Sequence, residues 1–76
     1  MTQQYKASVK GISNSKHPDI EGGKPLHFND VYTVDTDYFY STEDIYNYIK
    51  RDMLLVLGGG YTTDTVSSVT FSIEVA

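Results

Sequence analysis

The sequence predicts a small α+β domain: an antiparallel sheet of three or four strands with one α-helix on one face, in the order β-β-α-β. Three stretches support this prediction. A helical repeat covers about residues 42–57, and apolar residues alternate with polar ones over residues 5–11 and 69–75. At 76 residues the chain is expected to form a single domain over residues 1–76, with one small core.

The first alternating stretch predicts a strand with one buried face, made by Tyr5, Ala7, Val9 and Gly11. Residues 13–25 follow. They are dominated by turn-forming residues, have no apolar periodicity, and therefore predict a long flexible loop.

Residues 26–40 are rich in aromatic and β-branched residues and predict the second strand. Large apolar residues occupy both alternating faces of this stretch, which leaves two interpretations open. Either a bulge or turn near Asn29 and Asp30 splits the run, or both faces of the strand are covered. We favour one long bent strand, or two shorter strands that meet near residues 35–37.

Residues 42–57 have the signals of an α-helix. Ser41 is a suitable N-cap, and Glu43 and Asp44 in the first turn complement the helix dipole. Apolar residues recur three or four positions apart, at Ile45, Tyr48, Ile49, Met53, Val56 and Leu57. Three glycines at 58–60 then end the helix, because glycine adopts the left-handed C-terminal conformation without penalty.

The last strand has the clearest alternation, with Val69, Phe71, Ile73 and Val75 on one side. Because a strand at the end of a chain must be held by pairing, we expect it inside the sheet or along an interface.

Charge is unevenly distributed along the chain, whose formal net charge is −4. Residues 1–24 contain four lysines and two acidic residues, whereas residues 25–49 contain five acidic residues and no lysine or arginine. An acidic middle argues against direct nucleic-acid binding, which needs a contiguous basic surface.

No pattern in the sequence predicts a metal or cofactor. His17 and His27 have no third ligand placed by a motif, and the chain contains no cysteine. A calcium loop beginning at Asp35 would need an oxygen ligand and a glycine where Phe39 and Tyr40 stand. The glycines of 58–60 follow the helix, at its negative end, whereas a phosphate loop precedes its helix.

Catalytic residues are not predicted either, because no group of Ser, His and Asp lies in a recognisable context, so we expect a protein that is not an enzyme. Residues 1–20 do not resemble a signal peptide, and the longest apolar run, residues 53–57, is too short to span a bilayer. A cytoplasmic location without membrane contact is therefore expected.

Tyrosine is the strongest compositional signal: the chain has seven tyrosines and no tryptophan, and five of the tyrosines lie in the acidic middle. Tyrosine is enriched at protein interfaces. The candidate partner-binding surface comprises Asp30, Tyr32, Asp35, Asp37, Tyr38, Tyr40, Glu43, Asp44, Tyr46 and Tyr48. The alternative is that these tyrosines fill half-exposed edges of the core. Since Tyr46 and Tyr48 are about 200° apart around a helix, both cannot face the sheet.

The sequence also predicts a homodimer. One helix covers one face of the sheet, yet residues 26–40 have apolar side chains on both faces: Val31, Thr33 and Phe39 on one, and Tyr32, Val34 and Tyr38 on the other. The tyrosine-rich residues are expected on the uncovered face. A contiguous apolar patch on that face would be buried by a second copy, through face-to-face packing or edge-to-edge strand pairing.

The segment Tyr48–Asp52, followed by an apolar turn and by Gly58–Tyr61, resembles a pattern in small uncharacterised proteins of phages and prophages of Gram-positive bacteria. The resemblance brings no catalytic residue with it and implies an accessory protein that binds a host or phage protein. The resulting hypothesis is a small acidic binding protein that inhibits a host or defence protein. The alternative is a structural or assembly subunit whose tyrosine-rich surface is a self-association interface.

Overall fold

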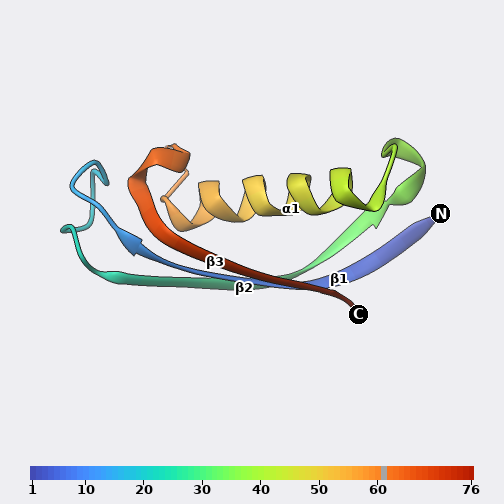
Figure 1. Ribbon diagram of the computed structural model, residues 1–76, viewed down its shortest axis with the longest axis horizontal. Helices are drawn as coiled ribbons and strands as arrows, with labels where there is room; N and C mark the ends of the chain where they lie inside the picture. The colour runs from blue at the N-terminus through green and yellow to red at the C-terminus, as the bar shows by residue number, and fades with distance from the viewer. Residues whose placement is uncertain (61) are drawn as a thin grey trace.

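The computed structural model describes residues 1–60 and 62–76. Its elements in order are β1 (Thr2–Ser13), β2 (Pro25–Asp35), the 3-10 turn η1 (Thr36–Tyr38), α1 (Thr42–Leu57), the 3-10 turn η2 (Thr63–Thr65) and β3 (Val66–Val75). The strands form one antiparallel sheet in the order β2-β1-β3, and α1 lies across one face of it (Figure 1). The predicted α+β fold is confirmed.

β1 is the central strand of the sheet. Tyr5, Ala7 and Val9 point to the helix and are almost fully buried, as their alternation predicted. The prediction that residues 69–75 lie inside the sheet is wrong, because β1 is the strand that pairs on both sides. β2 joins one edge of β1, and α1 then carries the chain across the sheet to the other edge, where β3 is added.

β2 is one continuous strand. Its pairing with β1 keeps one register from the Thr2–Asp35 pair to the Ile12–Pro25 pair, which excludes the alternative of a bulge or turn near Asn29 and Asp30. The favoured long strand is present and ends at Asp35. The register places the even-numbered apolar side chains of β2 on the helix face, beside the buried row of β1: Leu26, Phe28, Tyr32 and Val34.

The face of the sheet opposite the helix is mostly polar. Its cross-strand rows run from β2 through β1 to β3 as Val31–Lys6–Glu74, Asn29–Ser8–Ser72 and His27–Lys10–Thr70. The predicted contiguous, tyrosine-rich apolar patch on this face is therefore wrong. Tyr32 and Val34 face the helix, and η1 turns the chain after β2 and brings Phe39 against the core. The predicted homodimer therefore has no contiguous apolar patch on this face through which two copies could pack face to face.

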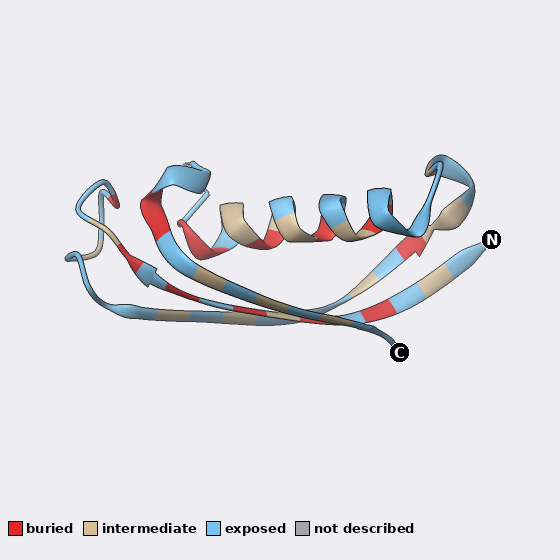
Figure 2. Ribbon diagram, viewed as in Figure 1, coloured by how far each residue is buried: buried red, intermediate tan, exposed pale blue. Residues whose placement is uncertain are grey.

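α1 has the predicted bounds and the predicted cap, in which the Ser41 hydroxyl accepts a hydrogen bond from the Asp44 amide at 3.2 Å. Its buried residues lie on the side turned to the sheet (Figure 2): Ile45, Ile49, Met53 and Leu57. Tyr48 and Val56 were also expected on this side but are about half exposed. Each precedes a buried residue by one position, which is about 100° around the helix.

The glycines after α1 have two separate roles. Gly59 and Gly60 have φ angles of 75° and 82°, and their amides bond back to the carbonyls of Val56 and Leu55, which is the Schellman arrangement of a helix C-terminus. Gly58 instead lies against η2, where a Cβ atom would collide with the Thr65 hydroxyl. The third glycine therefore permits η2, a segment of the same chain, to approach the end of α1 closely.

The connection between β1 and β2 is shorter than the predicted loop, because Ser13 and Pro25 both belong to strands. Ser13 ties its two ends together. The Ser13 hydroxyl accepts a hydrogen bond from the Lys24 amide at 2.9 Å and donates one to the Glu21 carbonyl at 2.6 Å.

The pairing of β1 with β3 contains the bulge of this sheet. Lys10 pairs with Thr70 and Ile12 with Ser67, so two residues of β3, Ser68 and Val69, lie opposite Gly11. Ser68 has a φ angle of 54°, in the left-handed region that disfavours residues with a Cβ atom.

Replacement of Met53 tests the buried stripe of α1. Met53 is fully buried, with 0% of its surface exposed. We expect Met53→Ala to lower the free energy of unfolding by roughly 3 kcal/mol, because it leaves a cavity at the helix–sheet contact. The control is Val56→Ala on the exposed side, which should cost less than about 1 kcal/mol in the same denaturant titration. Equal losses in the two variants would contradict the assignment of the buried side.

Replacement of Ser68 tests the bulge. We expect Ser68→Gly to raise the free energy of unfolding by up to about 1 kcal/mol, since glycine adopts this φ angle without a steric cost. Ser67→Gly, at a regular position in the same strand, should instead lower stability. A lower melting temperature for Ser68→Gly than for the unaltered chain would show that the bulge does not adopt this conformation in solution.

Candidate functional site

The structure brings most of the predicted partner-binding residues to one end of the molecule. The segment from Asp35 to Asp44 runs from the end of β2 through η1 to the first turn of α1. Tyr48, one turn further along the helix, joins it through a ring contact with Phe39. We call this surface the acidic corner, and it comprises Asp35, Asp37, Tyr38, Tyr40, Glu43, Asp44 and Tyr48.

Phe39 separates two tyrosines that point away from the protein. Its ring is half-buried against the core and lies 5.6 Å from the ring of Tyr48, at an interplanar angle of 54°. Tyr38 is 84% exposed and Tyr40 is fully exposed. Large aromatic side chains in water are uncommon without a binding role, so these two are the most informative feature of the corner.

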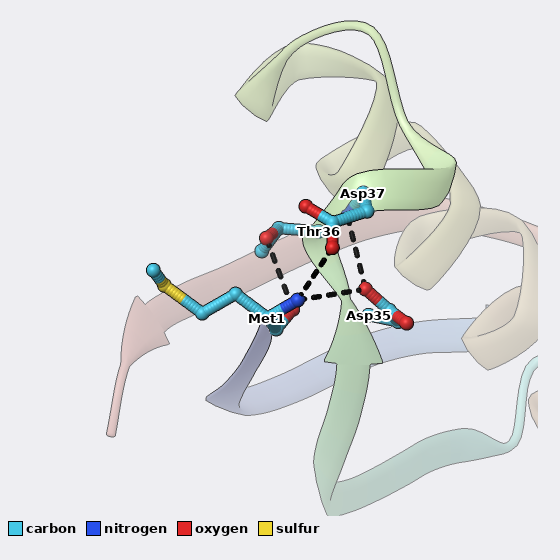
Figure 3. A network of polar contacts seen from close by, with 4 residues as sticks. All are labelled: Met1, Asp35, Thr36 and Asp37. Carbon is cyan, nitrogen blue, oxygen red and sulfur yellow. Dashed lines mark hydrogen bonds and ion pairs between the residues drawn. The ribbon is translucent and has the colours of Figure 1, made fainter.

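The backbone of the corner is held by hydrogen bonds around η1 (Figure 3). The Asp35 carboxylate accepts a hydrogen bond from the Asp37 amide at 3.0 Å, which caps the turn. The N-terminal ammonium of Met1 donates to the Asp37 carboxylate at 2.7 Å and to the Asp35 carboxylate at 3.2 Å. The amide and hydroxyl of Thr36 donate to the Met1 carbonyl.

These contacts shift the ionisation of the groups involved. Hydrogen bonds to Asp37 and Asp35 raise the pKa of the Met1 ammonium above 8.0. The pKa of Asp35 is lowered, first by the hydrogen bond from the Asp37 amide and then by the ammonium. Both groups are therefore charged at neutral pH. The corner has four carboxylates and one ammonium there, a net charge of −3.

Two of the predicted tyrosines belong to the core rather than to the corner. Tyr32 lies under the helix, and its hydroxyl donates a hydrogen bond of 2.6 Å to the Asp52 carboxylate, which links β2 to α1. Burial and this hydrogen bond raise the pKa of Tyr32 above its ordinary value of 10.0. Tyr46 packs edge-to-face on Tyr5, with ring centroids 5.8 Å apart. Tyr46 is thus half-buried and Tyr48 half-exposed, in agreement with their predicted separation around the helix.

Asp30 also lies apart from the corner, in the middle of β2. Its carboxylate is exposed and accepts a hydrogen bond from the Val31 amide at 2.8 Å.

Two contributors to the corner were absent from the predicted set: Phe39, which had been grouped with Val31 and Thr33 on one face of the second strand, and the Met1 ammonium. The Tyr-Phe-Tyr order of residues 38–40 was the signal for Phe39, since one ring of such a triplet can turn inward while its neighbours turn outward.

Within residues 1–60 and 62–76, no group of three or more His, Asp or Glu side chains is placed to hold a metal ion. In the same part of the chain, no helix has the length and apolar character needed to cross a membrane. The groups that the corner offers to a ligand are exposed aromatic rings, carboxylates and a backbone held by hydrogen bonds.

Comparison of the chain with protein-family models, with curated proteins and with solved structures finds no match. The function of the chain is therefore inferred from its own geometry.

The hydrogen bond between Tyr32 and Asp52 predicts a specific dependence on pH. Folding raises the pKa of Tyr32, so the folded protein keeps this proton at pH values where the unfolded chain has lost it. Its contribution to stability is complete below pH 10.0 and falls as the pH rises from there toward the folded pKa. We expect Tyr32→Phe to cost roughly 1 to 2 kcal/mol at neutral pH, because Asp52 loses its hydrogen-bond donor.

Denaturant titrations at neutral and alkaline pH would measure this difference. The expected result is that Tyr32→Phe unfolds more easily at neutral pH and loses less stability than the unaltered chain as the pH rises above 10.0. Tyr40→Phe is the control, since the Tyr40 side chain is fully exposed and should show no such effect. Identical pH profiles for Tyr32→Phe and the unaltered chain would contradict the assignment.

Proposed function

We propose that this chain is a small acidic, non-enzymatic protein-binding domain that contacts its partner through the acidic corner. The observation that supports this most directly is the exposure of Tyr38 and Tyr40 on either side of the half-buried Phe39. Binding surfaces commonly place a few aromatic anchors at their centre, and those anchors supply most of the binding free energy.

The corner is suited to binding because its backbone is already fixed. Phe39 is held by the core and by Tyr48, and η1 is held by its own cap and by Met1. A surface that keeps its shape before binding loses less conformational entropy when a partner arrives. Tyrosine adds to this advantage, because it buries a large area with few rotatable bonds.

The charge of the corner indicates the chemistry of the partner. With a net charge of −3 around two exposed rings, the corner matches a basic surface, including one that normally holds nucleic acid. The resemblance to small phage and prophage proteins makes a host or phage protein the expected partner, and inhibition of a host or defence protein the expected effect.

The alternative function is that of a structural or assembly subunit, in which the tyrosines of the corner form a self-association interface. Sedimentation distinguishes the two functions. A homodimer that Tyr38→Ser and Tyr40→Ser convert to a monomer would favour the subunit, whereas a chain that is monomeric at micromolar concentration favours a separate partner.

Affinity capture tests the proposal. The immobilised chain should retain a basic protein from a lysate of a Gram-positive host bacterium, and high salt should release it, because screening weakens exposed charge pairs. The double variant Tyr38→Ser with Tyr40→Ser should bind that protein roughly tenfold or more weakly. Glu43→Lys should also weaken binding, because it reverses one charge of the corner.

Two matched controls separate this result from general effects. Ile12→Ser with Val31→Ser removes two exposed apolar side chains from the opposite sheet face, and Glu74→Lys makes the same change in net charge outside the corner. Both control variants should still bind the partner protein. A partner that tolerates the tyrosine variant, that high salt does not release, or that is never captured would contradict the proposal.

A further inference from the structure

The two edges of the sheet differ in how they are protected. β2 begins with Pro25 and places the charged Asp30 within its apolar row, and both features discourage another strand from pairing there. β3 contains neither proline nor lysine, and after the bulge at Ser68 it runs regularly to its end. Among the described residues, β3 therefore provides the unprotected edge.

The hydrogen-bond pattern identifies which groups β3 presents at this edge. The Ala76 amide donates to the Gln4 carbonyl at 2.9 Å, so even-numbered residues of β3 after the bulge bond to β1. The backbone groups of the odd-numbered residues, Phe71, Ile73 and Val75, consequently point away from the sheet. The side chains of the same residues face the side that carries the helix, since they pair with the buried row of β1.

That side of β3 is incompletely covered. The buried core is formed mainly by α1 and β1, and β3 adds only Val66 to it. Phe71 and Ile73 are half-buried, and Val75 is 58% exposed. Two adjoining hollows of about 470 and 620 Å³ lie between α1 and β3 and share Lys50 and Phe71 in their walls. We call them together the β3 groove. Its apolar wall is completed by Tyr46, Leu54, Leu55, Val69 and Ile73.

The rim of the β3 groove is basic. The Lys50 ammonium lies 5.8 Å from the centre of the Phe71 ring, and Arg51 is exposed next to it. Neither side chain forms an ion pair with any residue that the structure describes. Asp52, the next residue, turns to the other side of the helix and binds Tyr32.

We propose that an extended, acidic segment of a partner protein adds to β3 as a fourth strand and fills the β3 groove. Its backbone pairs with the free groups of Phe71, Ile73 and Val75, and its alternate apolar side chains cover the exposed part of that row. A carboxylate in the row that faces the groove contacts Lys50 or Arg51. This site is separate from the acidic corner and has the opposite charge.

A second copy of this chain fits the same edge less well. Antiparallel pairing of two β3 strands about Ser72 would place apolar side chains opposite one another and Thr70 opposite Glu74. However, Glu74 lies on the face of the sheet away from the helix, so the second strand would leave Lys50 and Arg51 without a carboxylate. Charge complementarity therefore favours an acidic partner segment over self-pairing.

A random peptide library displayed on phage, selected against the full chain, tests this proposal. The expected result is enrichment of peptides that alternate apolar and polar residues and place Asp or Glu in the apolar row. Ile73→Pro removes an outward-pointing amide and keeps the hydrogen bonds between β3 and β1. It should weaken the binding of such peptides roughly tenfold or more. Thr33→Pro is the matched control, because the Thr33 amide points outward from the β2 edge.

Lys50→Glu is the second variant, since Ile73→Pro also removes part of an apolar contact. Lys50→Glu should weaken the binding of the acidic peptides by a similar factor. Peptides with lysine in place of the carboxylate residue should again bind to the Lys50→Glu variant. Hydrogen exchange gives an independent measurement. The amides of Phe71, Ile73 and Val75 should exchange rapidly in the free chain and become protected with the peptide, whereas those of Val31 and Thr33 should not change.

Several results would overturn the proposal. They are the absence of alternating acidic peptides after selection, binding that survives Ile73→Pro or Lys50→Glu, and protection of the β3 amides in a peptide-free dimer. The last result would make a second copy the occupant. The variant Tyr38→Ser with Tyr40→Ser should still bind the peptide, so this test and the test of the acidic corner fail independently.

Discussion

The contact between one stripe of α1 and the central strand is the interaction on which the whole domain depends. Ile49 and Met53 lie against the row formed by Tyr5, Ala7 and Val9, and these are among the most buried side chains of the protein. A chain of 76 residues has little other apolar area to bury, and without cysteine it has no disulfide bond to stabilise it. The sheet order contributes to this burial, because β1 is the central strand and its helix-facing side chains have a neighbouring strand on each side.

The same contact leaves parts of the molecule uncovered. A helix is roughly 10 Å wide and strands are about 4.8 Å apart, so one helix cannot cover three strands evenly. α1 and β1 supply most of the buried core, and the apolar rows of both outer strands, including that of β3, stay half-exposed on either side. At the other end, the turn η1 must lift the chain from β2 to the helix, which forces Tyr38 and Tyr40 outward while Phe39 turns in.

These two uncovered regions are opposite in charge and in shape. The acidic corner is a convex feature of exposed rings and carboxylates, whereas the β3 groove is apolar with a basic rim. A protein with two such surfaces is suited to holding two partners, or two parts of one partner. Their separation on the fold also means that each can be altered without changing the other.

The sequence by itself determined the features that depend on nearby residues. The bounds of α1, the Ser41 cap, the glycine end and the alternation of β1 all involve contacts within a few positions, and so do Tyr38, Tyr40, Glu43 and Asp44 of the corner. Only the tertiary structure decided the sheet order, the helix-facing side of β2, the inward turn of Phe39 and the ammonium at Asp37. Those features join residues far apart in the chain, as in the pairs Thr2–Asp35 and Tyr5–Val75, and several alternative pairings would have kept the same alternation.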